Sequence, residues 1–301
     1  MRVTLTGATG RIGRAIVEAL VARGDDVTVL SRSPDRARRS LPAGVAAEAW
    51  VPSGGPAPAA ALGGRDAVVH LAGEDVAQRW TERAKREIRE SREVGTRNLV
   101  AGIAAAAPRP RALVSASASG YYGARGDEPV DEDQPPGDDF LAQVVVAWER
   151  EARRAEELGV RVALMRTGVV LSPDAGALKK MLPPFRLGVG GPVAGGRQHM
   201  PWVHLDDVVG MYVQAIHDER WSGPVNVVAP GAVTNRDFSK ALGKALHRPA
   251  IAPVPALALK LLYGEMSQIV LTGVNMVPRR ALQLGYEFRH PEVRAALEAT
   301  V

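Results

Sequence analysis

The feature that most constrains the fold of this chain is a glycine-rich segment close to its start. The sequence Gly7-Ala8-Thr9-Gly10-Arg11-Ile12-Gly13 follows a strand-like run, Val3–Thr6, and opens an amphipathic pattern over 12–23 that stops at Gly24. A second β-branched run, Val27–Leu30, comes directly afterwards. Strand, glycine loop, helix and strand in this order form a βαβ unit, which is the context in which three closely spaced glycines indicate a dinucleotide site.

Each glycine of this segment has its own physical role in such a unit. Gly7 permits the tight turn, Gly10 lets the backbone approach a pyrophosphate, and Gly13 lets the helix pack closely on the strand. The free N–H groups and positive dipole of the helix N-terminus then face the phosphates. The sequence therefore predicts that the cofactor is contacted by Gly7, Thr9, Gly10, Arg11, Ile12 and Gly13.

The residues after the second strand indicate which dinucleotide is bound. An Asp or Glu at this strand end would accept a hydrogen bond from the adenosine ribose, whereas an arginine suits a 2′-phosphate. The chain has Ser31-Arg32-Ser33 here, and no carboxylate. A guanidinium and a serine hydroxyl favour NADP(H) over NAD, so we add Ser31 and Arg32 to the predicted cofactor site. The alternative is that Arg32 is an ordinary solvated arginine.

The rest of the first half repeats the alternation of strands and helices. Strands are predicted at 66–71, 112–115 and 161–166, and helices at 82–106 and 140–157. After Val170 the sequence pattern becomes typical of loops. This order is typical of an α/β fold with a doubly wound parallel sheet of the Rossmann type. We expect a dinucleotide-binding domain at 1–170, to which 200–229 returns, and a smaller, mainly helical substrate lobe at 171–199 and 230–301.

Composition excludes several classes of protein. The chain has no cysteine, so disulfides, thiolate metal sites and a cysteine nucleophile are excluded. Its charge of +5 could suit nucleic acid, but the arginines are scattered and aromatic residues make up only 5%. No apolar run approaches the roughly eighteen residues of a membrane span. We expect a cytoplasmic protein that binds a small-molecule substrate and binds neither nucleic acid nor membrane. A negatively charged substrate would suit the basic loops. The sequence leaves the oligomeric state open.

Several short motifs extend the pattern over the whole chain. In the first two thirds they are His70-Leu71-Ala72-Gly73, Arg79-Trp80-Thr81, Ser91-Arg92, Gly120-Tyr121-Tyr122-Gly123, Arg166-Thr167-Gly168-Val169-Val170-Leu171 and Trp202-Val203-His204. Near the end they are Gly264-Glu265-Met266, Pro278-Arg279-Arg280 and Gly285-Tyr286-Glu287-Phe288. With these motifs the chain resembles the extended short-chain dehydrogenase/reductases, and within them the atypical "epimerase family" group, which has a helical C-terminal module.

The superfamily resemblance implies a catalytic Ser–Tyr–Lys set, with the lysine four residues after the tyrosine. The five tyrosines are instead followed at that spacing by Arg125, Gly126, Ile216, Ser267 and His290. If Glu149 is matched to the acidic residue that often trails the motif, Leu141 and Val145 occupy the Tyr and Lys positions. Neither side chain can move a proton, and this group shares the defect.

Three polar residues remain as catalytic candidates. Ser117 lies four residues before Tyr121, a spacing similar to that of the superfamily's serine, and could orient a carbonyl. Tyr121 or Tyr122, just past the strand, could donate a proton if Arg125 lowered its pKa. The alternative is that both tyrosines merely pack the loop beside the cofactor.

Further cofactor contacts follow from position in the family pattern. We expect them at Leu71, Ala72 and Gly73 after one strand, at Glu87 and Arg92 on the following helix, and at Val170 near the nicotinamide end. For Glu87 and Arg92 the competing explanation is an exposed, ion-paired helix face.

Two further groups of polar residues have candidate roles in binding. His199, His204 and Asp206 match no standard zinc spacing, so we expect no metal and interpret Asp206 as a helix cap. Arg197 and Lys179 or Lys180 are candidates for contacting an anionic substrate.

The leading hypothesis is an NADP(H)-dependent oxidoreductase that acts on a small carbonyl or alcohol. The first alternative is a catalytically silent NADPH-binding sensor or partner-binding protein, since the Tyr–Lys pair is missing. The second is a nucleotide-sugar epimerase or dehydratase in which the nicotinamide is not turned over.

Overall fold

A computed structural model describes residues 1–301 and centres on one parallel sheet of seven strands. The strands are β1 (Arg2–Thr6), β2 (Asp26–Ser31), β3 (Ala46–Ala49), β4 (Ala67–His70), β5 (Ala112–Ala118), β6 (Arg161–Thr167) and β10 (Gly223–Val227). Their order across the sheet is β10-β6-β5-β4-β1-β2-β3, so the direction of winding reverses between β1 and β4. Ligands of open α/β sheets bind at such a reversal, beyond the carboxyl ends of the strands.

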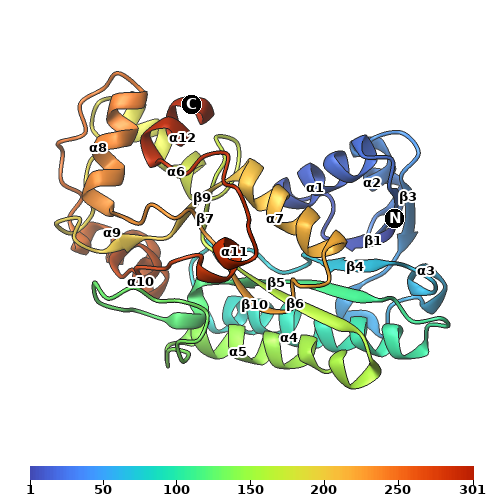
Figure 1. Ribbon diagram of the computed structural model, residues 1–301. Coiled ribbons are helices and arrows are strands. Elements are labelled where there is room, and N and C mark those ends of the chain that lie inside the picture. The colour runs from blue at the N-terminus through green and yellow to red at the C-terminus, as the bar shows by residue number, and fades with distance from the viewer.

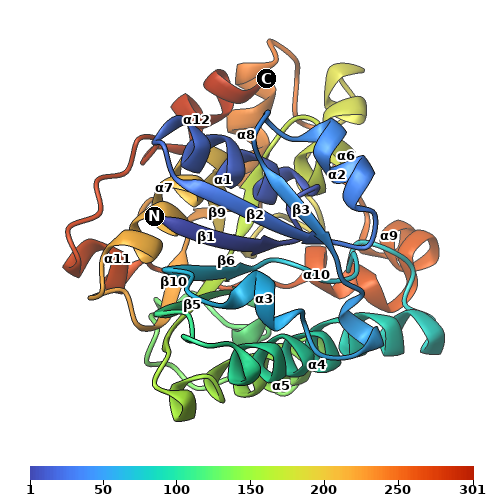
Figure 2. The same cartoon turned by 90° about the vertical axis from the view of Figure 1, so that its right-hand side faces the viewer.

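Helices cover both faces of this sheet (Figure 2). On one face lie α1 (Arg11–Ala22), α2 (Pro34–Ser40) and α7 (Leu205–His217), and on the other α3 (Ala59–Leu62), α4 (Glu82–Ala105) and α5 (Phe140–Arg153). The first layer buries one large apolar core that includes Leu5, Ile16 and Met211. The second layer buries another that includes Val68, Leu99 and Val162. Strands buried on both faces explain the continuous apolar runs in the sequence.

The remaining elements form a lobe beyond the carboxyl edge of the sheet, at the left of Figure 1. Its helices are α6 (Gly176–Arg186), α8 (Asn235–Ala245), α9 (Ala256–Tyr263), α10 (Gln268–Leu271) and α12 (Val293–Thr300), and its strands are β7 (Val169–Leu171), β8 (His199–Met200), β9 (Trp202–His204) and β11 (Val233–Thr234). Phe185, Phe238 and Leu297 belong to its separate apolar core. The helix α11 (Arg279–Gln283) instead packs toward the sheet, where Ala281 joins the first core.

The predicted fold class is confirmed, and the errors lie in individual elements. The strand β3 was missed because its sequence, Ala46–Ala49, carries no β-branched residue. The helix α6 was missed because Pro183 and Pro184 lie inside it. The strand β5 runs to Ala118 instead of residue 115, and α5 ends at Arg153 instead of residue 157. No helix is long and apolar enough to cross a membrane.

Candidate functional site

The glycine loop joins β1 to α1 at the point where the strand order reverses. Gly7 has a φ of +70°, and a Cβ on it would lie 2.7 Å from the backbone carbon of Leu71. A Cβ on Gly13 would lie 2.4 Å from the carbonyl oxygen of Gly7. Both distances are far below a normal contact, so these two positions require glycine: one for a left-handed turn against the next strand and one for close packing of the helix.

Gly10 has a different environment, because the only contact of an added Cβ would be the Gly7 oxygen, at 3.3 Å. Gly10 is exposed and is the N-cap of α1, where no side chain caps the helix. The first N–H groups of a helix have no intrahelical partner, so they remain open to a phosphate. Thr9 beside it is also exposed, while Ile12 is half-buried. The loop therefore fits a pyrophosphate, as the motif predicts.

Arg11 lies at the start of α1, but its side chain is engaged elsewhere. Its Nε donates to the Ser172 hydroxyl at 3.0 Å and lies 3.1 Å from Asp174 Oδ1. These contacts join the helix to the chain that follows β7. The backbone of Arg11 remains a candidate for phosphate contact, whereas its guanidinium links two segments.

A buried hydrogen-bond network beneath the loop was not foreseen from the sequence. The Thr6 hydroxyl lies 2.7 Å from His70 Nδ1 and accepts from the backbone N–H groups of Leu71 and Ala72. Because that oxygen accepts twice, its own hydrogen is directed to Nδ1, and His70 Nε2–H donates to the Thr96 hydroxyl at 3.0 Å. Burial, with a smaller effect of the nearby Arg92 charge, lowers the pKa of His70 to about 4. A neutral histidine thus fixes the ends of β1 and β4.

The end of β2 presents the residues expected to select the cofactor. Arg32 is exposed and makes no hydrogen bond or ion pair. The Ser31 hydroxyl accepts a hydrogen bond from the backbone N–H of Ser33 at 3.1 Å. The guanidinium of Arg32, directly after the strand that pairs with β1, has no protein partner and is available for a phosphate.

The segment after β4 is supported from below by Arg92. Its guanidinium donates to the carbonyl oxygens of Glu74 and Ile88, and a Cβ on Gly73 would lie 3.2 Å from its Cζ. Burial lowers the pKa of Arg92 to about 10, which still leaves it charged at neutral pH. Arg92 therefore shapes the loop 71–74 from beneath.

Glu87 and Val170 occupy different settings. Glu87 is exposed on α4 and pairs with Arg83 at 2.8 Å, which matches the alternative of an ion-paired helix face. Val170 is half-buried in β7, opposite Val203 of β9, and packs against the core on the α1 face.

Ser117, a catalytic candidate, points into a buried ionic network. Its hydroxyl donates to Glu149 Oε1 at 2.6 Å, and Arg166 binds both oxygens of the same carboxylate at 2.9 Å. All three residues are buried. The strand register pairs Ser117 with Arg166, so the network joins β5, β6 and α5. With its hydrogen committed to Glu149, this serine is not placed to orient a carbonyl, which corrects our expectation.

The two adjacent tyrosines have opposite settings. Tyr122 is fully buried; its hydroxyl donates to Asn226 Oδ1 at 2.7 Å and accepts from Arg166 at 3.0 Å. Burial raises its pKa to about 12, so it is a poor proton donor and we correct that expectation too. Tyr121 is half-buried with its ring 3.4 Å from the Arg166 guanidinium, and its hydroxyl makes no hydrogen bond. Arg125 donates to the backbone oxygens of Tyr122 and Pro135, and not to either hydroxyl.

The two positions that would carry the tyrosine and the lysine of a catalytic pair hold apolar side chains, and the structure places both beside the turn. A Cβ on Gly120 would lie 3.3 Å from Leu141 Cβ and 3.9 Å from Val145 Cγ2. Both residues of α5 therefore lie next to the turn that carries Tyr121. No side chain there can act as the lysine of a Tyr–Lys pair.

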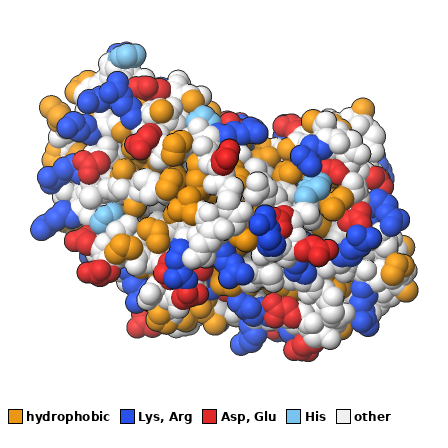
Figure 3. Space-filling model, in the orientation of Figure 1, with side chains coloured by type: hydrophobic (Ala, Val, Ile, Leu, Met, Phe, Trp, Pro, Cys, Tyr) orange, Lys and Arg blue, Asp and Glu red, His pale blue; other side chains and the backbone are white.

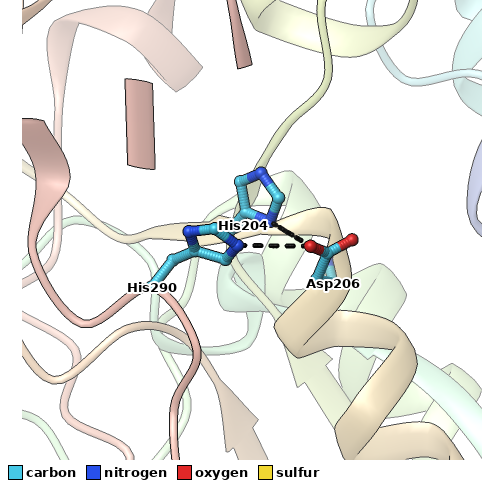
Figure 4. A group of neighbouring side chains, drawn as sticks. All are labelled: His204, Asp206 and His290. Atoms are coloured by element: carbon cyan, nitrogen blue, oxygen red, sulfur yellow. Dashed lines mark hydrogen bonds and ion pairs between the residues drawn. The ribbon is translucent and has the colours of Figure 1, made fainter. Parts of the chain in front are cut away.

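Three polar side chains meet at the start of α7 (Figure 4). His204 is the N-cap: its Nδ1 accepts the backbone N–H of Asp206 at 3.1 Å, so the cap is His204 and not Asp206 as we expected. His290 Nε2 lies 3.2 Å from Asp206 Oδ2, and the two imidazoles are 3.7 Å apart. His199 is not part of this group and lies 3.4 Å from Asp127. Because capping occupies His204 Nδ1 and a helix N-terminus repels cations, we interpret this group as structural.

The three basic candidates for substrate contact all lie on the lobe and are exposed. Lys180 of α6 donates to the carbonyl oxygen of Ala77 at 2.6 Å, so it connects the lobe to the loop after β4. Lys179 and Arg197 make no hydrogen bond.

Comparison with known proteins places the chain in a family. A model described as the NAD dependent epimerase/dehydratase family matches residues 3–228, and one described as a domain of unknown function matches 254–300. Epimerase family protein SDR39U1 of Mus musculus is 38% identical, over 100% of both chains. The chloroplastic homolog of that protein in Arabidopsis thaliana is 41% identical, over 99% of this chain and 86% of its own length.

Solved structures agree with this assignment. The crystal structure of human epimerase family protein SDR39U1 with NADPH has a TM-score of 0.89 and 36% identity, and the match covers 100% of this chain and 99% of that one. A UDP-glucuronic acid 4-epimerase from Bacillus cereus in complex with NAD has a TM-score of 0.78 at 16% identity, covering 100% and 95%, which shows the fold alone. The resemblance drawn from the sequence motifs is confirmed. The chain belongs to the NAD dependent epimerase/dehydratase family.

Proposed function

We propose that this protein binds NADP(H), with the pyrophosphate on the glycine loop and the 2′-phosphate on Arg32. The observation that carries the proposal is the guanidinium of Arg32 directly after β2, which is exposed and unpaired. No carboxylate lies at this strand end. A human relative at 36% identity was crystallised with NADPH, which supports the same choice. Glu87 remains a weaker candidate for a cofactor contact, because it is already paired with Arg83.

Calorimetric titration with NADPH and NADH tests this proposal. We expect NADPH to bind more tightly, and Arg32→Ala to reduce its affinity about 10- to 100-fold while NADH binding changes little, as for the loss of one charge-assisted contact. The matched control is Arg86→Ala, which removes another exposed arginine, on α4 and without a protein partner. Equal affinity for both cofactors in the unmodified protein would refute the choice of NADP(H).

For the chemistry, we propose reduction of a small carbonyl, or oxidation of an alcohol, next to the turn that carries Tyr121. In the reduction, bound NADPH would supply the hydride and the protein a proton; in the oxidation, bound NADP+ would take up the hydride and the protein the proton. Tyr121 is the better placed donor, since the hydroxyls of Ser117 and Tyr122 are held in the buried network. Tyr121→Phe should then abolish NADPH oxidation across a panel of carbonyl compounds without altering the affinity for NADPH.

A second candidate is a catalytically silent NADPH-binding protein that acts as a sensor or binds a partner. It is favoured by Leu141 and Val145, which leave the turn without a lysine. Capture of a partner that depends on NADPH, together with no turnover on the carbonyl panel, would support it. Turnover that disappears in Tyr121→Phe would exclude it. A nucleotide-sugar epimerase comes third, and isotope exchange at a sugar carbon would distinguish it.

A further inference from the structure

The helix α9 has a composition that should place it in the interior, yet it lies on the surface. Its sequence, Ala256–Tyr263, has Lys260 as its single charged residue, and none of its side chains is buried. Leu257, Leu261 and Leu262 are exposed by 67%, 71% and 63%. A helix that is apolar on all sides normally packs inside a protein or against another apolar phase. The protein as described leaves this helix uncovered.

Neighbouring segments of the lobe expose further large apolar side chains. The loop after α6 exposes Leu187 and Val189, and the segment before α9 exposes Ile251 by 82%. These two segments run side by side, since Val193 forms a parallel bridge with Val254 and the Ala194 N–H donates to the Val254 oxygen at 3.0 Å. We call the set Leu187, Val189, Ile251, Leu257, Leu261 and Leu262 the leucine face. It holds more than half of the large hydrophobic side chains that the whole chain exposes.

The two stretches that carry the leucine face are rich in basic residues. The two stretches that carry it, 176–199 and 235–263, contain nine lysines and arginines and a single acidic residue, Asp237. Arg186 directly precedes Leu187, Lys260 lies within α9, and Arg248 donates to the Arg186 carbonyl oxygen at 3.2 Å. Figure 3 shows Lys and Arg side chains over the left-hand lobe, with hydrophobic and some acidic side chains among them.

Exposed apolar side chains among basic residues distinguish between two partners that could cover the leucine face, a second copy of the chain and a lipid surface. A second copy of the chain, packed symmetrically, would bring two basic surfaces together and would be repelled. An anionic lipid surface instead takes up apolar side chains below its headgroups and attracts the basic rim. We propose that the leucine face docks on an anionic membrane surface, with α9 lying in the plane of the interface. We had expected no membrane partner because no apolar run is long enough to span, but a peripheral contact needs no such run.

Vesicle co-sedimentation of the full chain tests this. Phosphatidylcholine vesicles with about a quarter phosphatidylglycerol should bind the protein, pure phosphatidylcholine should bind it weakly, and raising the salt from about 0.1 M to 1 M should release it. Leu261→Ser combined with Leu262→Ser should lower the partition coefficient at least about tenfold. Lys260→Glu should weaken binding to the anionic vesicles selectively.

The matched control is Val51→Ser, which removes an exposed apolar side chain from the sheet domain, outside the leucine face. Unchanged NADPH affinity in every variant shows that the fold is retained, because the altered residues lie outside the cofactor site. The proposal is overturned if the double-serine variant binds anionic vesicles as well as the unmodified protein, or if neither binds. It is also overturned if light scattering finds a dimer that the two serines dissociate, since a second copy would then cover the face.

Discussion

The neutral His70 beneath the glycine loop makes a quantitative prediction about acid stability. Its pKa is about 4 in the folded protein, against 6.5 for an unperturbed histidine. The unfolded chain therefore takes up a proton between pH 6.5 and pH 4 that the folded chain does not. The contribution of neutral His70 to the free energy of unfolding is fully present above pH 6.5. It falls by up to about 1.4 kcal/mol per pH unit as the pH drops, and below pH 4 no more of it is lost. Over the whole window the loss amounts to about 3 kcal/mol.

Urea unfolding at pH 7.5 and pH 4.5, followed by tryptophan fluorescence, measures this loss. Other groups titrate in the same range, so the informative quantity is the difference between the unmodified protein and His70→Asn. The variant is expected to be less stable at pH 7.5, because Thr6 and Thr96 lose their partner, but to lose about 2 to 3 kcal/mol less on acidification. His247→Asn is the matched control, because His247 is exposed and its left-handed backbone, at φ +53°, suits asparagine. Equal acid losses in the unmodified protein and His70→Asn would refute the reasoning.

Three further predictions concern the loop and the buried charges. Gly13→Ala places a Cβ 2.4 Å from a carbonyl oxygen and should reduce NADPH affinity at least about tenfold by calorimetry, whereas Gly126→Ala, where nothing lies within 4 Å, should change little. Glu149→Gln leaves the Arg166 charge without its counterion and should lower the free energy of unfolding by about 3 to 5 kcal/mol in urea; a loss below about 1 kcal/mol would contradict a buried ion pair. Asp207→Ala deprives the backbone N–H groups of Arg289 and His290 of their acceptor, whereas the Tyr286 hydroxyl keeps the Asp207 carbonyl oxygen. The free energy of unfolding should fall by at least about 2 kcal/mol, seen as a lower melting temperature; unchanged melting would show that the segment 286–290 is held by other contacts.

The parts of this structure that the sequence could predict are those set by local rules. Gly7 and Gly13 could be assigned because a strand, a turn and a helix within thirteen residues leave only one geometry for them. The absence of a carboxylate after β2 is likewise visible in the sequence. By contrast, the partners of His70 lie 64 and 26 residues away along the chain, and no spacing rule relates them. Such contacts become readable only once the strand order is known.

Two of the three catalytic candidates, Ser117 and Tyr122, were misjudged for the same physical reason. A spacing of four residues between Ser117 and Tyr121 says nothing about the side of the sheet on which the serine hydroxyl finds its partner. In the structure that partner is Glu149, 32 residues away, and the charge that balances it is Arg166 on the adjacent strand. A lone carboxylate buried there would be costly, so the arginine and the carboxylate depend on each other.

The buried pair of Glu149 and Arg166 supports the proposed catalytic part of the site, whereas other residues support the cofactor-binding part. The network holds the turn that presents Tyr121, and the Arg166 guanidinium stacks on the ring of that tyrosine. Loosening the network should therefore displace the Tyr121 hydroxyl while leaving the glycine loop, which rests on Thr6 and His70, in place. The two supports share no residue. A variant such as Glu149→Gln, if it remains folded, should keep NADPH affinity within about twofold and lose turnover; a parallel loss of both would mean that the two halves of the site are mechanically coupled.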